Sequence, residues 1–268
     1  MRFRASDVVV SLALNVETEE FATAAGVGAS VAGELGASAI EIQRADPEGG
    51  RKGFIVDLLT SVPVIEGEPV GDALRRAVSP AAAKYRVDLG GLEFRGDLAA
   101  VGYAELPLWQ EVQWNGYIVF SLSAEPGGRQ ELRRSVFVTR PDFTPRADSD
   151  LVIRVHLRVP VADPVRALDL CGPEIAATDA SFVQIVSAQA AGSAEEYCEV
   201  ALLSAVPALD GEDAEAGLRR VTEALAARLG LAGGSPEVRD GMAVLAFEPD
   251  GRVESVAVRV QDDPLYED

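Results

Sequence analysis

The chain has 268 residues, of which 48% are hydrophobic and 25% charged, a composition typical of globular rather than disordered proteins. Asp and Glu together number 43 against 24 Lys and Arg, so the formal net charge is −19 at pH 7. Charge of this sign repels nucleic-acid phosphates and anionic membrane surfaces, and we therefore expect neither as a partner.

The N-terminal third predicts both strands and helices. Residues 8–16 are apolar and β-branched, as in a strand, and residues 39–43 predict a second, short strand. Apolar positions recur at helical spacing within 17–35, but the glycines of this segment lower helix propensity, so a strand-turn-strand alternative stays open. Residues 54–64 are ambiguous between strand and helix, and residues 71–83 predict a short helix.

The middle of the chain has the pattern of β-structure. Residues 113–123 alternate in polarity and are followed by a Pro-Gly-Gly turn, so we expect them to form a hairpin with residues 131–140. Residues 151–159 also alternate, with apolar side chains expected on one face and Arg154, His156 and Arg158 on the other.

Prolines and glycine at positions 164, 172 and 173 make residues 161–179 the expected linker. It would separate a β-rich α+β domain at 1–165 from a small α+β domain at 178–268, although a single domain remains an alternative. No internal repeat is evident. The expected fold is α+β, with a largely antiparallel N-terminal sheet carrying one or two helices.

The C-terminal part predicts a compact β-β-α-β-β unit. Its helix has apolar residues at clean i, i+3 and i+4 spacing and ends before Gly230, and a Pro-Asp-Gly turn separates its last two strands. The expected segments, in chain order, are strands 182–188 and 197–206, the helix 210–229, and strands 242–247 and 253–260.

The sequence lacks the common motifs for nucleotide binding and for hydrolase catalysis. It contains neither the phosphate-binding pattern G-x-x-x-x-G-K-[ST] nor the nucleophile elbow G-x-S-x-G. Gly26 and Gly28 follow a predicted strand, but a dinucleotide site would need a third glycine where Val31 stands. We therefore expect no cofactor.

Histidine and cysteine chemistry is limited by the single histidine and two cysteines. His156 lies in mid-strand between two arginines, where a solvated strand face is the simplest interpretation. Cys171 lies in a turn-like Leu-Cys-Gly-Pro context that could expose a thiol, and Cys198 is expected to pack inside a strand. Because free cysteines usually behave as small hydrophobic residues, we do not expect either to be a nucleophile. Acids at 210–215 coincide with a helix start, where they favour capping over calcium binding. We expect no metal site.

One segment departs from the acidic background. Seven arginines occur between Arg129 and Arg158 against four acids, and such a basic stripe could contact an anion or an acidic protein surface. A charged, solvated strand face is the simpler explanation, because the edges of sheets are commonly charged. The candidate contact residues are Arg133, Arg134, Arg154, His156 and Arg158.

Taken with the absent motifs, these features favour a non-catalytic binding, scaffold or assembly protein that contacts a protein partner or a second copy of itself. A small-anion sensor and an enzyme with dispersed Asp, Glu and Arg side chains are the alternatives. The apolar run at 8–16 is interrupted by Asn15 and followed by acids, unlike a signal peptide, and no window is long enough to span a membrane. With only two widely spaced cysteines, we expect a cytoplasmic protein.

Overall fold

The computed structural model describes residues 3–4, 6–46, 49–87, 89–91, 93–95, 98–101, 112–114, 116–127, 140–142, 144, 147, 149–189, 195–231, 234–247 and 252–260. The chain divides into two compact units. Unit 1 comprises Met1–Ala45 and Arg51–Leu132, and unit 2 comprises Asp46–Gly50 and Arg133–Asp268. The two units are described separately below.

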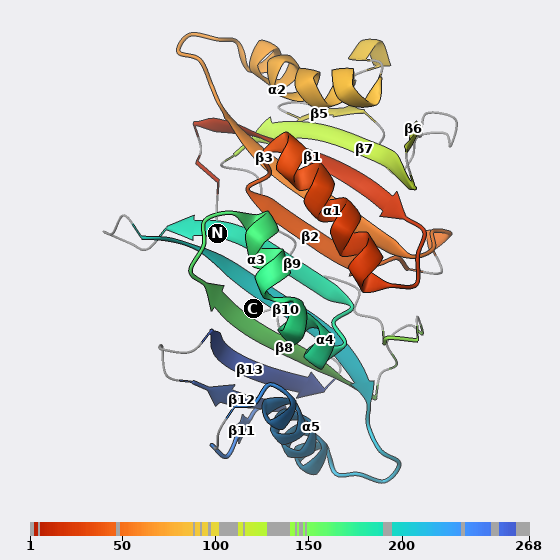
Figure 1. The fold of residues 1–268 in the computed structure, drawn as a ribbon, viewed down its shortest axis with the longest axis vertical. Coiled ribbons are helices and arrows are strands. Elements are labelled where there is room, and N and C mark those ends of the chain that lie inside the picture. Colours follow the sequence, from red (N-terminus) through yellow and green to blue (C-terminus); the bar gives the residue numbers. More distant parts are fainter. Residues whose placement is uncertain are drawn as a thin grey trace. The chain divides into compact units, whose positions relative to one another are not determined.

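Unit 1 is an antiparallel sheet with helices on one face (Figure 1). Its strands lie in the order β2-β3-β1-β7-β5-β4, and β6 pairs with β7. The elements in chain order are β1 (Asp7–Val16), α1 (Phe21–Leu35), β2 (Ala39–Arg44), β3 (Phe54–Pro63), α2 (Val70–Tyr85), the 3₁₀ turn η2 (Leu89–Gly91), β4 (Glu93–Arg95), β5 (Leu98–Val101), β6 (Val112–Trp114) and β7 (Tyr117–Pro126).

Unit 2 is also an antiparallel sheet with helices on one face. Its strands lie in the order β9-β10-β8-β13-β12-β11. The elements in chain order are β8 (Asp150–Val159), α3 (Pro164–Leu170), α4 (Gly172–Thr178), β9 (Phe182–Gln189), β10 (Glu196–Pro207), α5 (Ala214–Arg228), β11 (Glu237–Arg239), β12 (Met242–Ala246) and β13 (Val253–Val260).

The two units share one topology. In each, the first strand lies beside the third, the second strand lies outside the third, and the last strand lies on the other side of the first. This is the connectivity of the split βαβ, or ferredoxin-like, motif. Between the second helix position and the last strand, unit 1 adds β4, β5 and β6, and unit 2 adds β11 and β12. In each unit two of the added strands, β5 with β4 and β12 with β11, extend the sheet beyond the last strand. The chain is therefore a structural duplication.

The duplication is also detectable in the sequence, so the expectation that no internal repeat exists was wrong. The segment 56–76 reads V-D-L-L-T-S-V-P-V-I-E-G-E-P-V-G-D-A-L-R-R, and 200–220 reads V-A-L-L-S-A-V-P-A-L-D-G-E-D-A-E-A-G-L-R-R. Equivalent hydrogen bonds accompany it. The backbone N–H of Ser38 donates to the Leu59 carbonyl at 2.8 Å, and that of Ser181 donates to the Leu203 carbonyl at 2.8 Å. Dissimilar residues between the matching positions hide the repeat from a search for periodicity.

The expected α+β class with a mainly antiparallel sheet is confirmed. The expected C-terminal β-β-α-β-β order is observed with one additional short strand, β11, between the helix and the last two strands. Residues 17–35 contain one helix, α1, and residues 54–64 contain a strand, β3. The strands on either side of the expected Pro-Asp-Gly turn pair with each other as a hairpin. The hairpin partner expected at 131–140 lies outside the described residues, apart from Arg140.

The division into units differs from the expected domains. The segment 161–179, expected as a linker, contains α3 and α4, and β8 pairs with strands of unit 2 rather than ending the first domain. The reason lies in where the prolines stand. Pro164 and Pro173 each occupy the first turn of a helix, where a missing backbone N–H costs no hydrogen bond. Asp163 caps α3 by accepting from the Val165 N–H at 2.9 Å.

The helices of each unit cover one face of its sheet (Figure 1). In unit 2 the buried residues Val152, Phe182 and Leu203 lie on the other face. Along β8, the buried residues Leu151, Ile153 and Val155 alternate with others that face away from the helices, as the pleat of a strand requires. Within the described part of the chain, no helix combines the length and apolar character needed to cross a bilayer.

Candidate functional site

The predicted arginine stripe is only partly described. Arg133 and Arg134 lie outside the described residues. Arg154, His156 and Arg158 alternate along β8 on the face of the sheet that carries no helix, and all three are partly exposed.

Acidic and aromatic side chains contact His156 and Arg158 at one end of this face. The His156 Nδ1 lies 2.7 Å from a Glu254 carboxylate oxygen, and an Arg158 nitrogen lies 4.0 Å from Glu195. The Arg158 guanidinium also stacks 3.9 Å from the centre of the Tyr197 ring. Because these groups already balance one another, this end of the stripe is a self-neutralised cluster and a poor site for a free anion.

Arg140, another member of the stripe, has a structural role. Its Nε lies 3.5 Å from the carboxylate of Asp150, which is almost fully buried at the start of β8. The same carboxylate accepts the Ala147 N–H at 3.0 Å. Arg140 therefore balances a buried negative charge that would otherwise be costly.

Both cysteines are buried, including Cys171 in its turn-like context. Cys171 lies between α3 and α4 and packs inward. Burial, together with the Glu174 carboxylate, raises the pKa of the Cys171 thiol to about 12, and burial raises the pKa of Cys198 to about 11. A thiol of this kind stays protonated at neutral pH and is a weak nucleophile.

We therefore expect neither thiol to react with a disulfide reagent such as Ellman's reagent in the native protein at pH 8. Both should react within seconds once the chain is unfolded in guanidinium chloride, because unfolding restores ordinary thiol pKa values. The single variants Cys171→Ala and Cys198→Ala assign each thiol in turn. Rapid modification of one thiol in the folded protein would contradict the burial described here.

Metal ligation finds no support among the described residues, where no three His, Cys, Asp or Glu side chains gather in a way that could hold an ion. The acids at 210–215 are used otherwise. Asp213 caps α5 by accepting the Ala216 N–H at 3.3 Å, and Glu212 pairs with Arg220. The capping interpretation is therefore confirmed for Asp213 alone.

A feature that the sequence analysis missed is a pair of equivalent turns, one in each unit. The turn between β3 and α2 spans residues 64–68, and that between β10 and α5 spans residues 208–212; we call them the clamped turns. In each, the N–H of the glutamate donates to the carbonyl three residues earlier at 3.0 Å. Each hydrogen bond closes a four-residue turn, 65–68 or 209–212, whose third residue is glycine. The φ angle is 79° at Gly67 and 72° at Gly211, in the left-handed region that a type II turn needs at this position.

A bidentate ion pair holds each turn against its helix. Arg76 donates two hydrogen bonds to Glu68, at 2.9 and 2.8 Å, and Arg220 donates two to Glu212, at 2.6 and 2.7 Å. The Arg partner lowers the pKa of both glutamates, so each pair stays ionised at neutral pH. Both glutamates also accept the backbone N–H at the head of the turn, from Ile65 and Leu209, at 3.3 Å.

The clamped turns present apolar side chains to solvent. Among the residues that the structure describes, the exposed large hydrophobic side chains all lie in these turns or at the adjoining start of α2. They are Val64 at 41% exposure, Ile65 at 57%, Val70 at 51% and Leu209 at 55%. Ile65 and Leu209 stand at equivalent positions of the repeat. The recurrence of G-E and of L-R-R at one spacing was the sequence signal that could have found these turns.

Comparison of the chain with protein family models, with curated proteins and with solved structures found no match.

Proposed function

We propose that this protein is a non-catalytic binding or scaffold protein that contacts partner proteins through its two clamped turns. The observation that carries the proposal is the concentration of exposed large hydrophobic residues at these turns, among the described residues. Single exposed hydrophobic residues are common on protein surfaces, but here they recur at equivalent positions of a duplicated fold.

The turns do not need apolar side chains for their own structure. Ile65 and Leu209 contribute a backbone carbonyl and a backbone N–H to the turn hydrogen bonds, which any residue other than proline can supply. An exposed isoleucine or leucine contributes nothing to a core, whereas burial in a partner would stabilise a complex by about 25 cal/mol per Å² of apolar surface. Binding therefore explains a feature that folding does not.

Rigid presentation suits these side chains to recognition. The bidentate Arg–Glu pair, the turn hydrogen bond and the left-handed glycine restrain each turn before any partner arrives. A pre-ordered loop loses less conformational entropy on binding than a flexible one, so more of the contact energy appears as affinity.

Charge indicates the kind of partner. Exposed acids flank the apolar side chains, namely Glu66 and Asp72 in unit 1 and Asp210, Asp213 and Glu215 in unit 2. We therefore propose a partner protein with a shallow apolar pocket surrounded by Lys or Arg, which the net charge of −19 would also attract from a distance. A second copy of this chain would carry the same negative charge, which disfavours it as the occupant.

The rest of the function follows from the same charge and cysteine usage. Two buried free thiols suit a reducing cytoplasm, and the negative charge disfavours nucleic acid and anionic membranes as partners. The observation that supports a non-catalytic role over a small-anion sensor or a dispersed enzyme site is the self-neutralised state of His156 and Arg158.

The test compares three forms of the chain as affinity baits in extracts of the source cells. They are the wild type, the double variant Ile65→Ser with Leu209→Ser, and a control with Ala22→Ser and Ala216→Ser on exposed helix positions. A protein captured by the wild type and the control but lost by the turn variant is then purified and titrated against all three forms. We expect at least a tenfold loss of affinity in the turn variant, because apolar anchors dominate interface energies.

Equal affinity of the purified partner for the turn variant and the wild type would overturn the proposal. So would a bait experiment in which no captured protein depends on the turns. Native mass spectrometry of the purified wild type provides an independent check. A defined homo-oligomer that the turn variant fails to form would replace the proposed partner with a second copy of the chain.

A further inference from the structure

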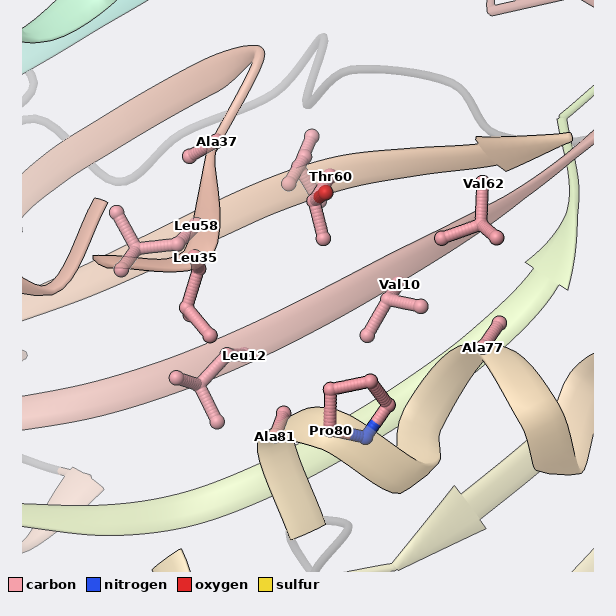
Figure 2. Close-up of a pocket in the computed structure, with 11 residues that line it drawn as sticks. Val10, Leu12, Leu35, Ala37, Leu58, Thr60, Val62, Ala77, Pro80 and Ala81 are labelled. Carbon is pink, nitrogen blue, oxygen red and sulfur yellow. The ribbon is translucent and has the colours of Figure 1, made fainter. Parts of the chain in front are cut away.

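Unit 1 contains an apolar cavity of about 100 Å³ between its helices and its sheet. Figure 2 shows α2 on one side, β1 and β3 beneath, and the C-terminal end of α1 on the other side. Thr60 supplies the one polar side chain among the residues that line it. The lining residues are Val10, Leu12, Leu35, Ala37, Leu58, Leu59, Thr60, Val62, Ala77, Pro80 and Ala81.

The two units differ at positions of α2 that line the cavity. Alignment of the L-R-R segments places Ala77 and Ala81 of α2 at the positions of Val221 and Leu225 in α5. Val221 and Leu225 are larger residues and are buried in unit 2. The smaller alanine side chains at both positions of α2 line the cavity of unit 1.

The cavity has a buried apolar floor and a partly exposed margin. Val10, Leu12 and Leu58 are almost fully buried, whereas Thr60, Val62 and Leu35 are partly exposed. A molecule can therefore enter from the surface without unfolding the unit. Cavities lined by aliphatic carbon offer water too few hydrogen-bond partners, and one of about 150 Å³ in another protein stays dry and takes up benzene or xenon.

We infer that this cavity is a binding site for the aliphatic end of a small molecule, such as a short alkyl chain carrying one hydroxyl group. The alkyl chain would fill the cavity and pack against Val10, Leu12 and Leu58. Its hydroxyl group would form a hydrogen bond with the hydroxyl of Thr60 at the margin. This activity goes beyond the proposed contact with partner proteins and uses none of the residues of the clamped turns.

Methyl NMR of the full chain tests the site with xenon and 1-pentanol as separate probes. We expect saturable shifts of the methyl groups of Val10, Leu12, Leu58 and Val62 with either probe. The variants Ala81→Leu and Ala77→Val introduce the residues that unit 2 carries, and each should weaken binding of both probes at least tenfold. Ala83→Leu, an exposed position on the same helix, should bind like the wild type.

The hydroxyl contact has its own readout. Thr60→Val should weaken 1-pentanol several-fold and leave xenon binding unchanged, because only the alcohol has a hydrogen bond to lose. The inference is overturned if neither probe produces saturable shifts at these methyl groups, or if both filled variants bind as the wild type does. Ala81→Leu and Ala77→Val should still bind the proposed partner protein through the clamped turns. The result for the cavity is therefore independent of the result for the partner protein.

Discussion

Replacement of Phe182 by alanine is expected to lower the free energy of unfolding of unit 2 by about 3–5 kcal/mol, the usual cost of removing a buried aromatic side chain. Phe182 is fully buried in a cluster with Val152, Leu203 and Ala205. It stands opposite Leu203 in the pairing of β9 with β10, so its removal leaves a cavity beside a strand in the interior of the sheet. Urea unfolding followed by circular dichroism measures the change.

Phe247→Ala provides the matched control within the same unit. Phe247 is partly exposed, so its truncation should cost clearly less than that of Phe182. If the two variants lower the free energy of unfolding equally, the cluster around Phe182 contributes less to stability than its burial indicates. Because the chain has two units, the transition should be assigned to unit 2 by amide exchange before it is analysed as two-state.

Gly53→Ala is expected to destabilise unit 1 by about 3 kcal/mol or more, from backbone strain together with a steric clash. Gly53 has φ of 82°, and a Cβ atom there would lie 2.1 Å from the Val16 carbonyl oxygen and 2.7 Å from the Thr18 nitrogen. The clash is with backbone, which cannot move aside without disturbing the ends of β1 and β3. The Gly53 carbonyl also accepts the Ala45 N–H at 2.9 Å, which holds the glycine in place.

Gly50→Ala separates the two causes. Gly50 has φ of 75° in the same loop, but no atom lies within 4 Å of the position that its Cβ would take. Its substitution should cost only about 1 kcal/mol, from the left-handed conformation alone. Thermal unfolding of the two variants side by side measures the difference, and equal destabilisation would show that the close approach of Val16 to Gly53 is not the dominant cause.

Local sequence patterns predicted the elements whose periodicity is complete. Strict alternation in 151–159 and the apolar stripe of the last long helix correspond to β8 and α5. The segment 161–179 was predicted to be a linker but contains the helices α3 and α4. Proline and glycine are read as breakers when their place in a helix is unknown, yet two of these residues begin helices.

The candidate site was less accessible to sequence reasoning. The sequence predicted an outward strand face for Arg154, His156 and Arg158, but the glutamates that contact His156 and Arg158 come from other parts of the chain. Glu254 lies on β13 and reaches His156 only because β13 pairs with β8. The clamped turns depend on Arg76 and Arg220 reaching back to the start of their own helices, which a search for known catalytic motifs does not consider.

The amino-acid sequence by itself determined the α+β class, the antiparallel strands of the C-terminal unit and the acidic character of the surface. These properties follow from local periodicity and composition, which each segment carries alone. Only the tertiary structure decided that the two units share one topology with equivalent exposed turns, and that alanines on α2 line a cavity. Those features depend on how the segments pack and hydrogen-bond against one another, which local periodicity and composition do not describe.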